Sequence, residues 1–270
     1  MSGKVALAVI VVAWQDLPEL DDCLESLCSQ DDDDFEVVVA DNGAGLAARL
    51  EKWADRLTIR HLDLGENLGV SVARNRAVQA CDAELLLFLD DDAIADPDWV
   101  AAYRDLFRTN EGVAAARGRV EGKSDSLLND LARAYDLGDS RIPAIINTEG
   151  NCGIRRLDFD QVGGFDEKMF GHEGAEISSR LIANRGSDEA IVYEPSAVIH
   201  HDYVDSVGGY LKKRYRHGVM VEHLSLEVLR KSAVKSRRRS KWSPERVALL
   251  PVKAAGVGAE AIGAIRSRAA

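Results

Sequence analysis

Three consecutive carboxylates, Asp90-Asp91-Asp92, are the side chains of this sequence best suited to chemistry. They directly follow five apolar residues, 85–89, and carboxylates at the end of a buried strand are costly without a partner because like charges repel. In an extended segment, side chains two positions apart point the same way, so Asp90 and Asp92 can hold one ion while Asp91 faces elsewhere. Oxygen ligands of this kind select Mg²⁺ or Mn²⁺. The alternative is a solvated acidic turn that caps a helix beginning near Pro97.

The elements that must position this triplet alternate between strand and helix. Apolar and β-branched runs predict strands at residues 5–13, 35–40, 57–62, 84–89 and 113–117, and helical patterns separate them at 16–27, 69–80 and 97–107. Such alternation is typical of an α/β fold, a mostly parallel, Rossmann-like sheet flanked by helices. Ligands bind at the carboxyl ends of such strands, so Asp41, at the end of the second one, should share an edge with the triplet.

The second half of the chain is less regular. Strands are expected at 145–152, 189–193 and 197–200, a helical turn at 158–162, and helices at 173–184 and 206–230. We expect two units, a domain at residues 1–211 and a helical basic C-terminal appendage at 212–270.

Charge divides the chain in the same way. Residues 212–270 contain 15 Lys or Arg and 4 Asp or Glu, whereas residues 1–211 contain 19 and 41, for a net charge of −11 overall. The negative net charge of residues 1–211 argues against nucleic acid as the main ligand, because a phosphate backbone binds to positively charged protein surfaces. The basic residues Lys235, Arg237, Arg238, Arg239 and Lys241 precede apolar positions and could give peripheral contact with anionic membrane headgroups, although charge runs are usually solvated.

The cysteine spacing and the hydropathy of the sequence indicate where in the cell the protein is expected. The four cysteines show no CxxC spacing, so neither a zinc site nor a disulfide framework is expected, and a reducing cytoplasm fits. The apolar run at 5–14 ends without a small-residue cleavage site and is read as a buried strand. No stretch approaches the roughly 20 apolar residues of a membrane span. We expect a cytoplasmic protein, at most peripheral at the membrane.

Several motifs in order resemble family 2 glycosyltransferases with the GT-A fold. Residues 67–75 match the pattern N-x-G-x-x-x-A-R-N, a strand follows, and Asp90-Asp91-Asp92 matches the D-x-D motif. The later stretches 151–156, 162–167 and 171–173 match as well, so the resemblance covers residues 5–205. Each motif is weak alone, but together they point strongly to this family.

The resemblance implies a role for individual residues. It assigns nucleotide-sugar binding to Ala13, Trp14, Asp41, Arg74, Asp90 and Asp91, and metal binding to Asp90, Asp92 and His201. Asp41 would bind the nucleobase above the end of the first strand, and Arg74 would lie near the diphosphate. His200 is the adjacent alternative to His201. Without the resemblance, Asp41 could simply shape its Asp-Asn-Gly turn, and Arg74 could be a surface helix residue.

The resemblance also implies an activity. A metal ion, Mn²⁺ or Mg²⁺, would neutralise the diphosphate leaving group of a nucleoside-diphosphate sugar. A hydroxyl acceptor (a glycan, a lipid-linked intermediate or a small molecule) would attack the anomeric carbon with the help of a carboxylate base. The family is inverting, so a single displacement is expected.

One position departs from the family pattern. The family usually carries Glu-Asp at the start of the helix at 173, and its second residue supplies the base, but this chain has Glu173-Gly174-Ala175-Glu176. Glu173 or Glu176 could serve instead, since residues three apart on a helix can face one site. Alternatively, Glu173 only favours the helix N-terminus and Glu176 is solvated.

Two other functions remain open. A non-catalytic homologue that only binds sugar nucleotides would explain Gly174. A sugar nucleotidyltransferase is the other alternative, but such enzymes carry a Gly-rich loop with a basic residue after the first strand, where this chain has Ala13-Trp14-Gln15-Asp16.

Overall fold

A computed structural model of the chain describes residues 6–132, 135–220 and 249–269. Within these residues nine strands form one mixed sheet in the order β3-β2-β1-β4-β8-β6-β9-β5, and β7 pairs with β9 at the side. The strands are β1 (Leu7–Ala13), β2 (Glu36–Asp41), β3 (Ile59–Asp63), β4 (Leu85–Asp90), β5 (Ile94–Ala95), β6 (Ala115–Glu121), β7 (Ile142–Pro143), β8 (Asn151–Arg155) and β9 (Ile191–His200).

The first four predicted strands form the parallel half of this sheet. β1 lies between β2 and β4 and pairs with both in parallel, and β3 continues the parallel order beyond β2. β1, β2 and β4 are apolar and buried almost throughout, as expected of strands covered on both faces. The carboxyl ends of β1, β2 and β4 therefore lie at one edge of the sheet, which places Asp41 and Asp90 there.

The second half differs from the sequence prediction in its strands, and the short β7 was not predicted. The strand expected at 145–152 begins only at Asn151, because a turn joins the Thr148 carbonyl to the Asn151 N–H. The strands expected at 189–193 and 197–200 form one strand, β9, whose pairing with β6 shifts between Glu194 and Val198. Pro195 lies within this irregularity, where its missing N–H breaks no ladder bond.

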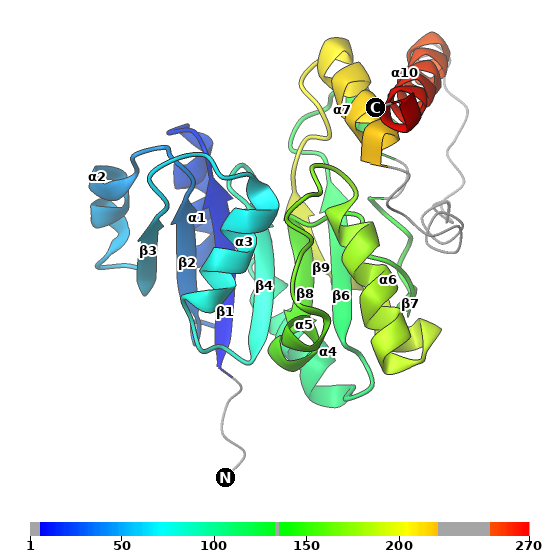
Figure 1. Ribbon diagram of the computed structural model, residues 1–270. Helices are drawn as coiled ribbons and strands as arrows, with labels where there is room; N and C mark the ends of the chain where they lie inside the picture. The colour runs from blue at the N-terminus through cyan, green and yellow to red at the C-terminus, as the bar shows by residue number, and fades with distance from the viewer. Residues whose placement is uncertain (1–5, 133–134, 221–248, 270) are drawn as a thin grey trace.

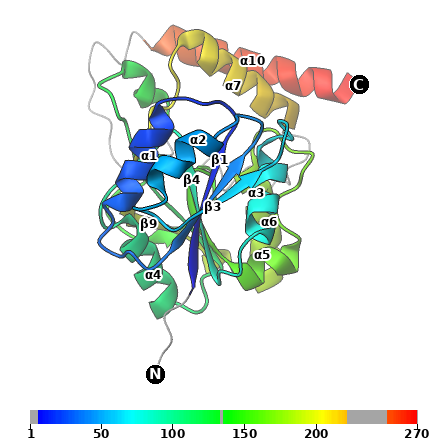
Figure 2. The same cartoon turned by 90° about the vertical axis from the view of Figure 1, so that its left-hand side faces the viewer.

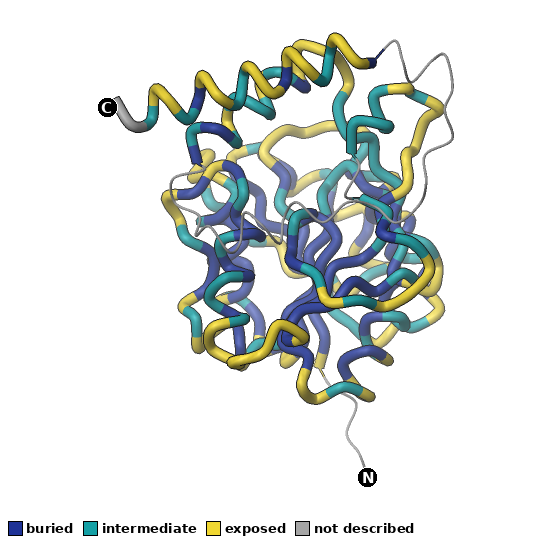
Figure 3. The backbone as a smooth tube through the Cα atoms, turned by 90° about the vertical axis from the view of Figure 1, so that its right-hand side faces the viewer, coloured by how far each residue is buried: buried dark blue, intermediate teal, exposed yellow. Residues whose placement is uncertain are grey.

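Helices cover both faces of the sheet (Figure 2). On one face α1 (Glu19–Cys28) and α4 (Trp99–Thr109) pack against one core, with the short α2 (Ala47–Leu50) nearby. On the other face α3 (Val70–Gln79), α5 (Arg156–Val162) and α6 (Glu173–Arg185) pack against a second core. The strands between them are the most buried part of the chain (Figure 3). Short 3₁₀ turns occur at Glu51–Trp53, Leu127–Leu131 and Asp188–Ala190.

Two further helices lie side by side across the carboxyl edge of the sheet (Figure 1). They are α7 (Val207–Met220) and α10 (Leu250–Ala269). Their backbones approach closely at glycines, since a Cβ on Gly218 would lie 1.9 Å from the Glu260 carbonyl oxygen and one on Gly263 would lie 2.3 Å from the Tyr215 carbonyl oxygen. The predicted boundary at 211/212 falls inside α7, and the basic run at 235–241 lies outside the described residues. In the part of the chain that the structure describes, no helix combines the length and apolarity needed to cross a bilayer.

Candidate functional site

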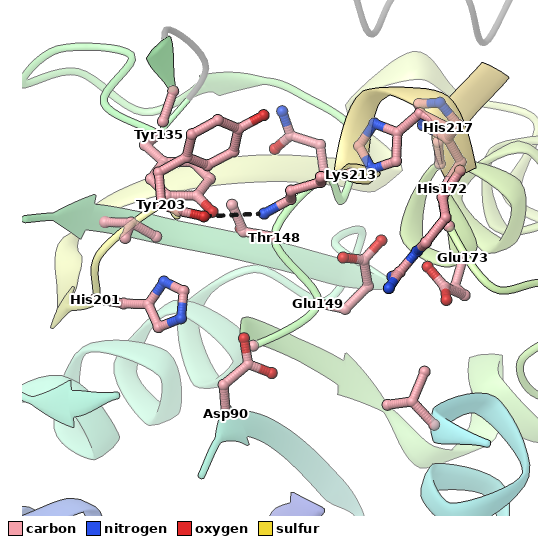
Figure 4. A pocket seen from close by; sticks show the side chains of 18 of the residues that line it. Asp90, Tyr135, Thr148, Glu149, His172, Glu173, His201, Tyr203, Lys213 and His217 are labelled. Carbon is pink, nitrogen blue, oxygen red and sulfur yellow. Dashed lines mark hydrogen bonds between the residues drawn. The ribbon is translucent and has the colours of Figure 1, made fainter. Parts of the chain in front are cut away.

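A cavity of about 580 Å³ opens at the carboxyl end of β4 (Figure 4). Its walls are the end of β4, the loop at 147–150, the first residues of α6, and α7 above them. The charged and titratable side chains that line it include Arg74, Asp90, Glu149, His172, Glu173, His201, Lys213, Arg214, Arg216 and His217. Helix α7 thus contributes three cations to the cavity, Lys213, Arg214 and Arg216, while Arg74 comes from α3.

The aspartate triplet occupies a turn rather than an extended segment. β4 ends at Asp90, and the N–H of Ala93 donates to the Asp90 carbonyl over 3.1 Å. The alternation argument for the triplet therefore does not apply, yet the turn brings Asp90 and Asp92 together. Asp91 offers no ligand atom to that cluster and does not line the cavity. Burial and the charges of Asp92 and Asp90 raise the pKa of Asp91 to about 7.

His201 completes a three-residue cluster with the two aspartates. One ligand atom from each of Asp90, Asp92 and His201 lies within 4.8 Å of the others. His201 Nε2 is 3.1 Å from Asp92 Oδ1, whereas the neighbouring His200 Nε2 bonds Asp96 over 2.8 Å. Burial alone would lower the pKa of His201, but the hydrogen bond to Asp92 and the charges of both aspartates raise it. Of the two predicted histidines, only His201 joins the cluster.

This cluster fits a divalent cation. It combines two carboxylates, whose mutual repulsion a cation relieves, with an imidazole nitrogen. Burial is the main reason that the pKa of Asp91 is raised, and the charges of Asp92 and Asp90, which a cation would offset, raise it further.

Arg74 projects from α3 toward the Asp90 carboxylate. Its guanidinium donates to Asp90 Oδ1 over 3.2 Å and lies over the ring of Phe165 at 5.7 Å. The side chain is only 9% exposed but lines the cavity. It is therefore not a solvated surface residue, which was the alternative interpretation, and it can meet an anion that enters the cavity.

The predicted nucleobase residues lie at the neighbouring strand ends, outside the cavity lining. Asp41 is buried, and its carboxylate accepts the N–H groups of Ala44, Gly45 and Leu46 at 2.6–3.0 Å. Burial raises the pKa of Asp41, but these backbone bonds and a contact with His61 lower it further, so the net shift is downward. Asp41 thus shapes its turn, whatever else it binds.

The end of β1 lies next to this turn. Ala13 is buried and pairs with Asp41 across the strands, while Trp14 is 55% exposed. Neither residue lines the cavity. An exposed indole at this edge leaves an aromatic surface open to a flat ligand.

The two predicted catalytic glutamates are separated. Glu173, the first residue of α6, is buried against the cavity, and burial together with the charge of Glu149 raises its pKa to about 7. Glu176 does not line the cavity, because Arg180, one helical turn later, donates to both of its carboxylate oxygens. The expectation that both face one site therefore does not hold, and the geometry favours Glu173.

Sequence reasoning missed several lining residues. Glu149 belongs to none of the sequence motifs named above, although it lines the cavity. The one signal in the sequence was Gly174, which lacks the carboxylate that the family pattern has at this position. The cations Lys213, Arg214 and Arg216 were counted with the basic appendage, but α7 brings them to the cavity. Lys213 Nζ donates to the Tyr203 carbonyl over 3.4 Å, and Arg214 pairs with Glu260 of α10.

Two histidines close the cavity beside Glu173. The rings of His172 and His217 lie 4.2 Å apart, and burial lowers the pKa of both, most strongly for His217 next to its basic neighbours. His172 has a φ of 65°, a left-handed conformation that costs energy in a residue with a side chain. This strained residue directly precedes Glu173, the first residue of α6.

A family model described as "Glycosyl transferase family 2" matches residues 8–165. The chain belongs to this family. The family that the motifs predicted is thereby confirmed, and the matched residues carry β1 through α5, including Arg74 and the Asp triplet.

Relatives in the glycosyl transferase family 2 match parts of the chain. Haloferax volcanii glucosyl-dolichyl phosphate glucuronosyltransferase is 24% identical over 73% of this chain and 69% of its own length. A validoxylamine A glucosyltransferase of Streptomyces hygroscopicus is 27% identical over 66% of this chain and 51% of its own length. The uncharacterized glycosyltransferase YfnE of Bacillus subtilis is 34% identical over 39% of this chain and only 28% of its own length.

Solved structures support the predicted GT-A fold. Residues 1–349 of S. aureus TarS superpose with a TM-score of 0.61 at 18% identity, covering 84% of this chain and 68% of that one. The mannosyltransferase PcManGT from Pyrobaculum calidifontis, in complex with GDP-Man and Mn²⁺, gives 0.63 at 20% identity and covers 100% and 76%. The sheet flanked by helices is therefore that of the GT-A glycosyltransferases, as predicted.

Proposed function

We propose that this protein transfers a sugar from a nucleoside-diphosphate sugar to a hydroxyl acceptor, with inversion and with Mn²⁺ or Mg²⁺ bound. The observation that carries the proposal is the cluster of Asp90, Asp92 and His201 beside a cavity with a cationic wall, in a chain of glycosyl transferase family 2. A solved structure with the same fold contains GDP-Man and Mn²⁺, and another contains UDP-GlcNAc, which supports a nucleotide-sugar donor.

The chain's own residues suit the departure of a diphosphate. Asp90, Asp92 and His201 would hold the cation, which when bound supplies positive charge to the leaving group. Arg74 of α3 and Lys213 of α7 both line the cavity and can each meet phosphate oxygens. Fixed cations in a partly closed site stabilise developing negative charge better than solvent does, since they need no reorganisation.

Transfer then needs only one displacement. The acceptor oxygen bonds to the anomeric carbon as the bond to the diphosphate breaks, and a carboxylate takes the hydroxyl proton. Of the two carboxylates expected from the sequence, Glu173 lines the cavity and Glu176 does not. The donor base would lie over β1 and β2 near Trp14 and Asp41.

Different parts of the chain have different roles in the proposed function. In this proposal the sheet and its flanking helices bind the donor and the metal ion, and α7 and α10 cover the carboxyl edge of the sheet (Figure 1). The outer side of α10 exposes Leu250, Val257 and Ile265, which are 54%, 63% and 67% exposed. That apolar side fits the predicted peripheral membrane contact of a cytoplasmic enzyme, while the basic run at 235–241 lies outside the described residues.

Calorimetry on matched variants tests the metal site. Wild-type protein is titrated with UDP- and GDP-sugars with and without MnCl₂. Asp92→Asn and His201→Ala should each weaken Mn²⁺-dependent donor binding by about tenfold or more, because each removes a ligand. His200→Ala is the matched control, since the neighbouring ring bonds Asp96 instead. Unchanged binding by Asp92→Asn would refute the metal assignment.

Turnover separates transfer from binding alone. The non-catalytic alternative predicts that wild-type protein binds a donor but releases no nucleoside diphosphate with any acceptor, water included. The family match gives no support to the nucleotidyltransferase alternative.

A further inference from the structure

Gly174 stands where the family pattern supplies a catalytic carboxylate, and the space beside it is already filled. A Cβ built on Gly174 would lie 2.7 Å from Glu149 Oε1, and also 2.6 Å from Ile146 Cγ2 and 2.8 Å from the Ile146 carbonyl oxygen. Those distances leave no room for a side chain at 174. The volume that an aspartate would enter at this position therefore holds the carboxylate of Glu149, which comes from a different segment of the chain.

Glu149 is held at that place by α6. The N–H of Gly174, the second residue of the helix, donates to Glu149 Oε1 over 2.6 Å. The first N–H groups of a helix have no partner within it, and the positive end of its dipole favours a negative charge. The contact thus fixes one oxygen of the Glu149 carboxylate. Among the described residues, no hydrogen bond joins Glu149 Oε2 to another group, so that oxygen can accept a proton.

The loop that carries Glu149 is also fixed at the metal end of the cavity. Gly150 packs against the Asp90 carboxylate so closely that a Cβ on it would lie 1.9 Å from Asp90 Oδ2. The Asp90 N–H donates to the Gly150 carbonyl over 3.3 Å. Glu149 consequently lies between the metal cluster and Glu173 (Figure 4). This is where an acceptor hydroxyl would have to approach the sugar of a donor whose diphosphate meets the cluster.

We propose that Glu149 is the catalytic base of this protein and replaces, from the loop at 147–150, the carboxylate that its family carries at the position of Gly174. The inference rests on the proposed glycosyl transfer. In the step, Glu149 Oε2 takes the proton of the acceptor hydroxyl and the acceptor oxygen bonds to the anomeric carbon. The bond from that carbon to the diphosphate breaks, and its electron pair leaves with the nucleoside diphosphate.

Glu173 is the competing assignment. It lines the cavity, and burial together with the charge of Glu149 raises its pKa to about 7. Position separates the two carboxylates. Glu173 lies one residue before Gly174, whereas the space beside Gly174, where the family pattern supplies the carboxylate, is filled by Glu149.

The test compares Glu149→Gln with Glu173→Gln in the full-length protein. The probe is release of nucleoside diphosphate from a panel of UDP- and GDP-sugars with MnCl₂, with water or a supplied alcohol as acceptor. Glu149→Gln keeps an oxygen for the Gly174 N–H, so we expect Mn²⁺-dependent donor binding within about threefold of wild type and a rate at least about 100-fold lower. A Glu149→Gln rate near that of wild type would overturn the assignment, and its collapse in Glu173→Gln instead would identify Glu173 as the base.

A second variant is needed in case Glu149→Gln loses donor binding for a structural reason. If Glu149→Gln does not bind donor, Glu149→Ala is assayed with sodium formate, a small carboxylate that can enter the space left by the side chain. Formate-dependent recovery of the rate supports a base at this place, and no recovery overturns it. If wild-type protein turns over no donor, the proposed function fails and this assignment with it, whereas an active wild type beside an active Glu149→Gln refutes the assignment alone.

Discussion

Replacing Gly174 by alanine should destabilise the protein, although alanine is the better helix former. Propensity alone predicts a gain of up to about 1 kcal/mol for Gly→Ala within a helix. The added Cβ would, however, lie 2.6–2.8 Å from two atoms of Ile146 and from Glu149 Oε1. One of these atoms is a backbone oxygen, which cannot move aside without displacing the loop. Overpacking of this kind costs about 1–3 kcal/mol, so we expect a net loss of about 1–2 kcal/mol.

Thermal unfolding measures this loss directly. For a chain of this size, 1–2 kcal/mol corresponds to a midpoint lowered by roughly 2–6 °C at a fixed heating rate. Gly258, in α10, provides the control, because a Cβ there meets no atom within 4 Å. Gly258→Ala should be neutral or slightly stabilising. If Gly174→Ala melted at or above the wild-type temperature, the close packing of Glu149 against α6 would be refuted, together with its consequence for catalysis.

Two further predictions concern stability. The pKa of Glu173 is raised from 4.5 to about 7 in the folded protein, so the folded state binds this proton more tightly than the unfolded state. The contribution of Glu173 to stability is therefore present below about pH 4.5 and lost as the pH rises to 7. Glu173→Gln should melt at nearly the wild-type temperature at pH 5 and above it at pH 8; parallel pH profiles of the two proteins would contradict this. Asn151 is fully buried and bonds Trp99, Tyr103 and the carbonyls of Arg119 and Ala197 at 2.7–3.1 Å. Asn151→Ala should cost about 3–5 kcal/mol in denaturant unfolding because it leaves these buried groups unpaired; the exposed Asn184→Ala is the control, and a similar cost for both would count against the network.

The parallel half of the fold could be predicted from the sequence because its signals are local. The apolar runs of β1, β2 and β4 and the helical patterns between them need no distant partner to be recognised. The second half was predicted less well. Its strands pair across long sequence separations, β8 antiparallel to β4 and β9 parallel to β6. The start of β8 depends on the turn at Thr148, and the continuity of β9 depends on its pairing with β6.

The sequence by itself determined the family, the positions of the parallel strands along the chain, and Asp90, Asp92 and His201 as candidate ligands. The order of the strands in the sheet came from the structure. The aspartates belong to one motif and the two histidines are adjacent, so the sequence could limit the candidate metal ligands to these few residues. Only the tertiary structure decided between His201 and His200, because the choice depends on which ring faces Asp92 and which faces Asp96.

Tertiary structure likewise separated Glu173 from Glu176 and brought Glu149 to the start of α6. Spacing along a helix places two side chains on one side, but a partner such as Arg180 can hold one of them away. Residues 149 and 174 are 25 positions apart, and no periodicity relates them. Their contact follows from the packing of a loop against a helix end, which only the folded chain defines.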